Sequence, residues 1–245
     1  GILPFATAAC VFVKWVGRER HPLPDTTADQ VANRFSNRLA DQVKAGRFDL
    51  ALRDFNQAIA VDPRFPNAYN NRGNVHVHEG DVEAAIADYT MAIRLAPSYP
   101  GAHGNRGRAR IMLGRYQEAK ADLDRAIELN PSDVNGRINR AIALKKLGDL
   151  QGAIAEYDIL IRMYPDEPTP YYNRALSWMA MGDHERAILD LNVCLGLDPG
   201  FARAYAMRSR VYHGMNMNTQ ALDDLLQAER LGVRIDQDYL RSLRE

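Results

Sequence analysis

Polar residues with functional chemistry recur through this 245-residue sequence at a fixed interval of 34 residues. One series is asparagine, whose amide offers one acceptor and two donors and can hold a peptide backbone without reading its side chains. Each asparagine is followed by arginine, which binds carboxylates and phosphates through a bidentate fork. The asparagines are Asn37, Asn71, Asn105, Asn139 and Asn173, and the arginines are Arg38, Arg72, Arg106, Arg140, Arg174 and Arg208.

Acidic residues form a third series with the same period: Asp54, Asp88, Asp122, Glu156, Asp190 and Asp224. The arginines could read an acidic or phosphorylated ligand, or each could pair with an acid across a helix–helix seam. Pairing is favoured because an unpaired half-buried arginine costs several kcal/mol, and because Lys+Arg and Asp+Glu number 31 each. We therefore predict a structural ion-pair ladder of Arg72 with Asp88, Arg106 with Asp122, Arg140 with Glu156, and Arg174 with Asp190.

The elements that position these residues share the 34-residue period. Within residues 66–99, a first helical stretch ends at Gly80, since glycine tolerates the left-handed conformation of a helix end. An amphipathic second helix runs from about Val82 to Leu95, and Pro97 cannot continue it. A small residue, Ala85, suits the helix crossing. The same glycine, alanine and proline positions recur in the neighbouring units.

This unit resembles the tetratricopeptide repeat, whose pattern is matched here by Tyr69, Gly73, Gly80, Ala85, Tyr89, Ala92 and Pro97. The common pattern has leucine where this chain has its arginine ladder. The resemblance implies an all-α fold, a right-handed α-solenoid of helix-turn-helix repeats whose first helices line a concave groove. Six repeats fit: 32–65, 66–99, 100–133, 134–167, 168–201 and 202–235.

The remaining segments flank the repeats. Residues 236–245 are expected to form a capping helix, and residues 22–31 a linker and the start of the first helix. Residues 1–21 hold an apolar stretch, 2–13, followed by basic residues. This stretch is interpreted as a remnant of a membrane anchor or signal, as a helix docking on a partner or membrane, or as a lipoprotein signal ending at Cys10. The basic residues favour the cytoplasmic face for the repeats, with membrane association through residues 2–16.

Candidate binding residues lie on the first helices. The asparagine ladder could grip an extended peptide, because helix spacing of roughly 10 Å matches about three extended residues; the alternative is that it stabilises repeat stacking. Polar residues of the middle repeats and apolar residues further along are also expected to face the groove, and the alternative there is a filled groove. The predicted partner-binding residues are Asn71, Asn105, Asn139, Asn173, Asn74, Arg108, Ile138, Ile142, Tyr172, Leu176 and Met179. The clamp that some family members use for a C-terminal carboxylate needs lysines where this chain has Asn70 and Asn135, so that ligand is not predicted.

No catalytic motif, metal-ligand spacing or phosphate-binding loop occurs in the sequence. His76 and His78 are two residues apart and would point to different faces of a helix. The balanced charge argues against nucleic acid. We therefore expect no catalytic residues, metal, cofactor or small-molecule substrate, and a non-enzymatic scaffold that binds a protein or peptide in its groove. The alternatives are a membrane-tethered accessory or assembly subunit of a larger complex, and a self-associating module.

Overall fold

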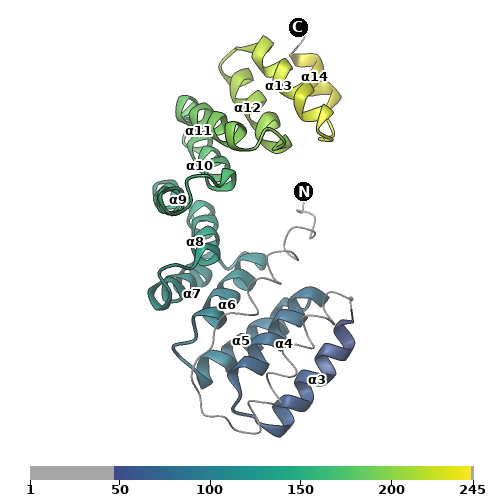
Figure 1. Ribbon diagram of the computed structural model, residues 1–245, viewed down its shortest axis with the longest axis vertical. Helices are drawn as coiled ribbons and strands as arrows, with labels where there is room; N and C mark the ends of the chain where they lie inside the picture. The colour runs from purple at the N-terminus through teal and green to yellow at the C-terminus, as the bar shows by residue number, and fades with distance from the viewer. Residues whose placement is uncertain (1–46, 244–245) are drawn as a thin grey trace. The chain divides into compact units, whose positions relative to one another are not determined.

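The structure, a computed structural model, describes residues 47–243, and within them every regular element is an α-helix (Figure 1). These residues divide into two compact units at Pro131. Unit 1 holds α3 (Phe48–Val61), α4 (Pro66–Glu79), α5 (Val82–Leu95), α6 (Pro100–Met112) and α7 (Tyr116–Leu129). Unit 2 holds α8 (Val134–Lys146), α9 (Leu150–Met163), α10 (Pro168–Ala180), α11 (His184–Leu197), α12 (Ala202–Gly214), α13 (Asn218–Arg230) and α14 (Gln237–Ser242).

The turn between the two helices of a repeat is built on a left-handed residue. Gly80 has φ 88° and Gly148 has φ 87°, and glycine adopts this conformation without a Cβ penalty. The last repeat has Asn216 in place of glycine, and Asn216 takes the same conformation at φ 59°. Asparagine is among the few other residues that tolerate it, so this departure from the repeat pattern leaves the turn intact.

Helix starts are set by proline and aspartate. Pro66, Pro100 and Pro168 open first helices, where the missing N–H of proline is not needed. The second helices α5, α9 and α11 are capped by aspartate: for example, Asp81 accepts a hydrogen bond from the Ala84 amide at 3.0 Å, and Asp149 one from Gly152 at 2.8 Å. Each cap satisfies one of the amides that a helix start leaves unpaired.

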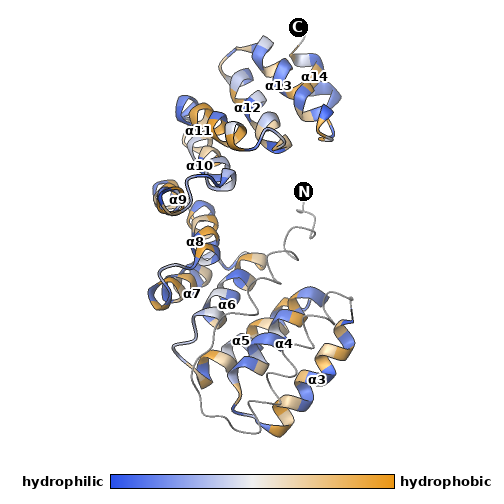
Figure 2. Ribbon diagram, viewed as in Figure 1, coloured by the Kyte–Doolittle hydropathy of each residue, from blue (hydrophilic) through white to orange (hydrophobic). Residues whose placement is uncertain are grey.

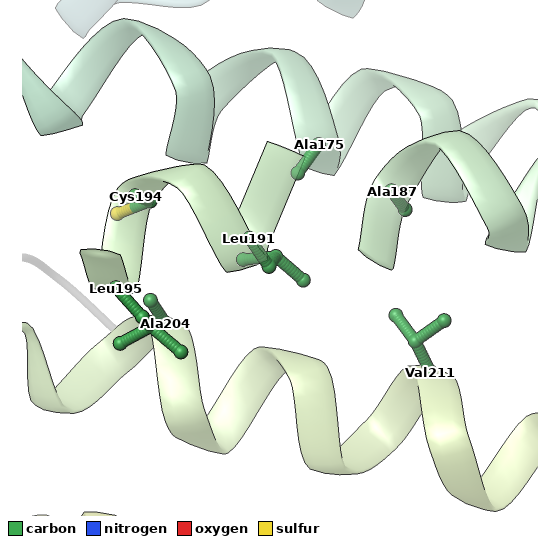
Figure 3. Packing of buried hydrophobic residues seen from close by; sticks show 7 residues of the cluster. All are labelled: Ala175, Ala187, Leu191, Cys194, Leu195, Ala204 and Val211. Atoms are coloured by element: carbon green, nitrogen blue, oxygen red, sulfur yellow. The ribbon is translucent and has the colours of Figure 1, made fainter. Parts of the chain in front are cut away.

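Small and large apolar residues both contribute to the core of each unit. Figure 2 shows hydrophobic and hydrophilic residues mixed along the helices. The periodic alanines of the second helices are fully buried, which lets paired helices approach closely. In unit 2, Leu191 and Cys194 of α11 lie between Ala175 of α10 and Ala204 of α12 (Figure 3). The buried alanines are Ala51, Ala85, Ala119, Ala153, Ala187 and Ala221.

The last repeat of unit 2 is covered by α14. Leu240 and Leu243 are buried against Ala221 and Leu225 of α13. The Tyr239 hydroxyl lies 3.0 Å from the hydroxyl of Ser209 on α12. The predicted capping helix therefore shields the apolar side that a terminal repeat would otherwise expose.

The first helices lie on the inner side of unit 1. Helix α4 packs against its own partner α5 and also contacts α6, the first helix of the following repeat. Helices α5 and α7 share no comparable contact, so the repeats curve with their first helices inside. We call this side the inner face, and the corresponding faces of α8, α10 and α12 the inner face of unit 2.

The predicted all-α fold of helix-turn-helix repeats is confirmed for the described residues. The apolar stretch within residues 1–21, the linker 22–31 and the first helix of the 32–65 repeat, with Asn37 and Arg38, lie outside them. Across residues 47–243, no helix combines the length and apolar character needed to cross a membrane.

Candidate functional site

Within residues 47–243, each periodic arginine of a first helix binds an acid on the second helix of its own repeat. Arg72 donates from Nε and Nη2 to the two carboxylate oxygens of Asp88, at 2.8 and 2.6 Å. Arg174 holds Asp190 in the same bidentate way at 2.8 and 2.6 Å. The carboxylates are buried, so these pairs sit at the helix–helix seam. Equivalent pairs join Arg106 to Asp122 and Arg208 to Asp224.

The fourth repeat keeps the pair with a longer acid. Arg140 donates from Nη2 to one oxygen of Glu156, and Arg137 donates from Nη1 to the other at 3.1 Å. Arg137 stands where other repeats carry an aromatic residue such as Tyr171, whose hydroxyl bonds to the Pro165 carbonyl. In this repeat the extra arginine joins the ion pair.

A third donor of the arginine reaches the preceding repeat. Arg72 Nη1 donates to Asn56 of α3 at 2.7 Å, and Arg174 Nη1 donates to Asp158 of α9 at 2.5 Å. One guanidinium therefore ties together three helices from two repeats. The acceptors Asn56, Thr90, Asp158 and Asn192 are short polar residues that the sequence prediction missed. Their 34-residue period, which also includes Asp124, is visible in the sequence.

The third repeat concentrates charge on Asp122. Besides Arg106, Arg110 donates to this carboxylate at 2.8 Å, and His103 lies 3.9 Å away. Burial alone would raise the pKa of Asp122, but the hydrogen bonds and charges of Arg106 and Arg110, with His103 nearby, lower it overall. The arginine and acid ladders are thus occupied by each other, and they do not form a free basic row for a phosphorylated ligand.

The asparagine ladder behaves differently in the two units. In unit 1, Asn105 Nδ2 donates to Asn70 Oδ1 at 3.0 Å, and Asn70 donates to Asn71 at 3.3 Å. This chain links α6 to α4, as expected of asparagines that stabilise repeat stacking. In the described part of unit 2, the amide groups of Asn139 and Asn173 are half-buried and form no hydrogen bond with the protein.

Asn74, which was expected to face the groove, is buried instead, and so is Asn70. Asn70 is 3% exposed, and Asn74 is 7% exposed and accepts a hydrogen bond from the Tyr89 hydroxyl at 2.8 Å. Buried amides need partners inside the protein, and the small Gly73 leaves room for the Tyr89 ring beside α4. Asn74 therefore serves the contact between α4 and α5.

The inner face of unit 2 carries half-exposed apolar side chains. Ile138 and Ile142 are one turn apart on α8, as are Tyr172 and Leu176 on α10, and Met179 follows one turn later. Such spacing places the residues of each helix on one side. Tyr172 also packs on the Phe201 ring, with centroids 5.1 Å apart, and burial raises the pKa of its hydroxyl.

One position of the first helices varies while the surrounding ladders repeat. Among the described first helices, the ninth residue of the repeat is polar or basic in unit 1 and apolar in the first two repeats of unit 2. We call these the ninth-position residues: Asn74, Arg108, Ile142, Leu176 and Arg210. A constant frame with a changing inner residue is the arrangement expected where a repeat surface distinguishes its ligand.

The described residues contain no group of three or more His, Cys, Asp or Glu side chains placed to hold a metal ion. A wide, open hollow of about 500 Å³ occurs at the α10–α11 turn. It lies at the turn and does not include the inner-face residues. Its lining residues are Met181, Gly182, Asp183, His184, Glu185 and Met215.

Sequence comparison identifies the repeats. Three models described as tetratricopeptide repeat match residues 40–100, 74–138 and 110–178, and together they span more than half of the chain. The chain belongs to the tetratricopeptide repeat family. No curated protein matches it in sequence.

Solved structures share the tetratricopeptide repeat fold. YrrB, described as a tetratricopeptide repeat protein with an unusual peptide-binding site, is 20% identical with a TM-score of 0.60 over 73% of this chain and 92% of YrrB. PilF of Pseudomonas aeruginosa is 17% identical, with a TM-score of 0.75 over 89% of this chain and all of PilF. PilW, a type IV pilus biogenesis factor, is 15% identical, with a TM-score of 0.75 over 91% of this chain and all of PilW. At these identities the likeness establishes the fold alone.

Proposed function

We propose that this tetratricopeptide repeat protein is a non-enzymatic scaffold that holds an extended segment of a partner protein on its inner faces. The observation that carries the proposal is the inner face of unit 2, where Ile142 and Leu176 occupy the ninth position and remain half-exposed. The seams of the same repeats are already filled by alanine, leucine and tyrosine. Apolar side chains left at a surface next to a complete core are typical of an interaction site.

The free amides of unit 2 supply the polar half of this surface. Asn139 and Asn173 belong to successive repeats, and their side chains form no hydrogen bond with the described protein. First helices spaced by roughly 10 Å match about three residues of extended chain. The two amides would bond to the partner's backbone, while Leu176 and its neighbours contact apolar side chains. Asn105 of unit 1 is used inside the fold and is not part of this grip.

The likeness to YrrB supports a peptide ligand for this fold, although the two chains are too different for residues to be transferred. The test is selection of peptides from a random library displayed on phage, using the whole chain as bait, followed by calorimetric titration of the synthetic peptides. Leu176→Asp introduces a charge on the inner face. Leu189→Asp is the matched control, because Leu189 is 63% exposed on α11, the second helix of the same repeat.

Selected peptides are expected to bind the parent chain and Leu189→Asp alike, and to bind Leu176→Asp at least tenfold more weakly. The double variant Asn139→Ala/Asn173→Ala should also weaken binding, by roughly 1 kcal/mol for each lost hydrogen bond. Peptides that bind Leu176→Asp as tightly as the parent, but lose affinity for Leu189→Asp, would place the site on the outer side.

A second proposal concerns membrane tethering. The apolar stretch within residues 2–16 and the fold shared with PilW, a pilus biogenesis factor, both favour an accessory or assembly subunit held at a membrane. In this proposal the repeats face the cytoplasm. Removing residues 1–21 should release the protein into the soluble fraction of fractionated cells. A truncated chain that still sediments with membranes would rule out tethering by this segment.

A further inference from the structure

The ninth-position residue of α6 is Arg108, a basic side chain on the inner face of unit 1. Two of its equivalents in unit 2 are the apolar Ile142 and Leu176, which the proposed function places against a partner. Arg108 is half-buried. Its Nε is fully buried and has no hydrogen-bond partner. The fold therefore desolvates part of this guanidinium without offsetting the loss, and such an unsatisfied buried donor calls for an explanation.

The other half-buried arginines of residues 47–243 all hold a carboxylate. Arg110 and Arg140 also have a buried Nε without an acceptor, yet each binds an acid through Nη. Arg108 is the member of this set that forms no ion pair in the described structure. The paired members are Arg72, Arg106, Arg110, Arg137, Arg140, Arg174 and Arg208.

The acids nearby are not available to Arg108. Asp88 is held by Arg72 through two hydrogen bonds. Asp122 is held by Arg106 and Arg110. The positive charge of Arg108 is consequently not paired with a carboxylate in the described part of unit 1, and its guanidinium can bind an acidic group of a ligand.

Neutral polar side chains surround this charge. Arg108 interacts electrostatically with the Tyr89 hydroxyl, which itself donates to Asn74. It also acts on His78, whose ring stacks on Phe48 with centroids 5.3 Å apart. Partial burial and the charge of Arg108 both lower the pKa of His78, so at neutral pH this histidine is uncharged. The surroundings thus present one positive charge rather than a basic cluster.

We propose that Arg108 is a carboxylate-binding residue that pairs with an acidic side chain of the partner segment on the inner face of unit 1. The inference rests on the proposed function and adds a charge requirement to it. A carboxylate is favoured over a phosphate because one guanidinium meets one negative charge, as in the internal arginine–carboxylate pairs of this chain. The planar fork of arginine matches the two oxygens of a carboxylate.

The test is a nuclear magnetic resonance titration of the whole chain that follows the arginine Nε–Hε signals. The Arg108 signal is assigned by its loss in Arg108→Gln. Four probes are compared at constant ionic strength: acetyl-Ala-Ala-Glu-Ala-Ala-amide, the same peptide with Gln for Glu, acetylated penta-alanine with a free C-terminus, and inorganic phosphate. The first and third distinguish a side-chain carboxylate from a chain end.

The Glu peptide should shift the Arg108 signal saturably, and the Gln peptide should not. A shift caused by the free C-terminus but not by the Glu peptide would contradict the proposal. The apparent affinity should fall at least tenfold in Arg108→Gln and stay unchanged in Arg94→Gln, which removes an exposed arginine from α5 of the same unit. Equal binding of the Glu and Gln peptides, tighter binding of phosphate, or an equal loss in Arg94→Gln would each overturn the proposal. Peptides selected for the Leu176 surface would remain bound in that case, so failure here is distinct from failure of the scaffold function.

Discussion

Replacing Arg174 with leucine tests the energetics of the ion-pair ladder, because leucine is the residue that the common repeat pattern has at this position. In the folded chain, the side chain of Arg174 is 21% exposed and that of Asp190 is 7% exposed. The substitution leaves the Asp190 carboxylate buried without either of its two hydrogen bonds. It also frees Asp158, whose side chain is 39% exposed and well hydrated.

The expected cost follows from these exposures. Removing one partner of a buried ion pair costs about 3–5 kcal/mol, and the partial exposure of Arg174 puts the loss near the lower end, at about 3 kcal/mol. The contact with Asp158 adds about 0–1 kcal/mol, as for other exposed pairs. Replacing both partners, in Arg174→Leu/Asp190→Leu, removes the stranded charge and should recover most of the loss, because apolar substitutes for buried pairs are often neutral.

The assay is urea unfolding followed by circular dichroism, with tryptophan fluorescence as a second probe of unit 2 through Trp178. Arg162→Leu, an exposed arginine on α9, is the control and should change the free energy of unfolding by less than about 0.5 kcal/mol. If the double variant is as unstable as Arg174→Leu alone, the two side chains are not energetically coupled, and the seam reasoning fails.

Three further predictions follow from other contacts. Cys194 is 0% exposed and burial raises its pKa to about 11, so in a Cys10→Ser background Ellman's reagent at pH 8 should find no reactive thiol until denaturant is added. Gly107→Ala should destabilise the chain by about 1–2 kcal/mol in urea unfolding, because its Cβ would lie 2.7 Å from Leu123. Gly196→Ala, whose Cβ meets nothing within 4 Å, should instead stabilise the chain by up to about 1 kcal/mol. A change of the same sign in the free energy of unfolding for both variants would contradict the packing. The pKa of Asp122 is lowered by folding, so its contribution to stability is present above about pH 4 and is lost as the pH falls through the folded pKa. In Asp122→Asn, the free energy of unfolding should therefore fall less steeply between about pH 5 and 2.

The repeat period made most of the fold predictable from sequence. Periodic glycine, alanine and proline each have one local role, so Gly80 and Ala85 indicate a turn and a helix crossing without knowledge of distant contacts. Asn216 shows the limit of pattern matching, since it departs from the glycine pattern yet adopts the same left-handed backbone.

The candidate site was less predictable, because neighbours in three dimensions decide which of its side chains are buried and hydrogen-bonded and which remain available to a ligand. Asn74 and Arg108 share the ninth position of their repeats. Asn74, however, accepts a hydrogen bond from the Tyr89 hydroxyl and is buried within the fold. Asn56 accepts a hydrogen bond only because successive repeats are in contact. The residue type alone does not predict that contact. The asparagine ladder likewise divides into a stacked part at Asn105 and an unpaired part at Asn173 only when hydrogen bonds are known.

The most direct test of partner binding on the inner face is site-specific photocrosslinking with a selected peptide. Benzoylphenylalanine is placed at Leu176 in one variant and at Leu189 in another, and each is irradiated with the biotin-labelled peptide. The account predicts a crosslinked product at position 176 that excess unlabelled peptide abolishes, and none at position 189. A competable crosslink at position 189 without one at position 176 would contradict it.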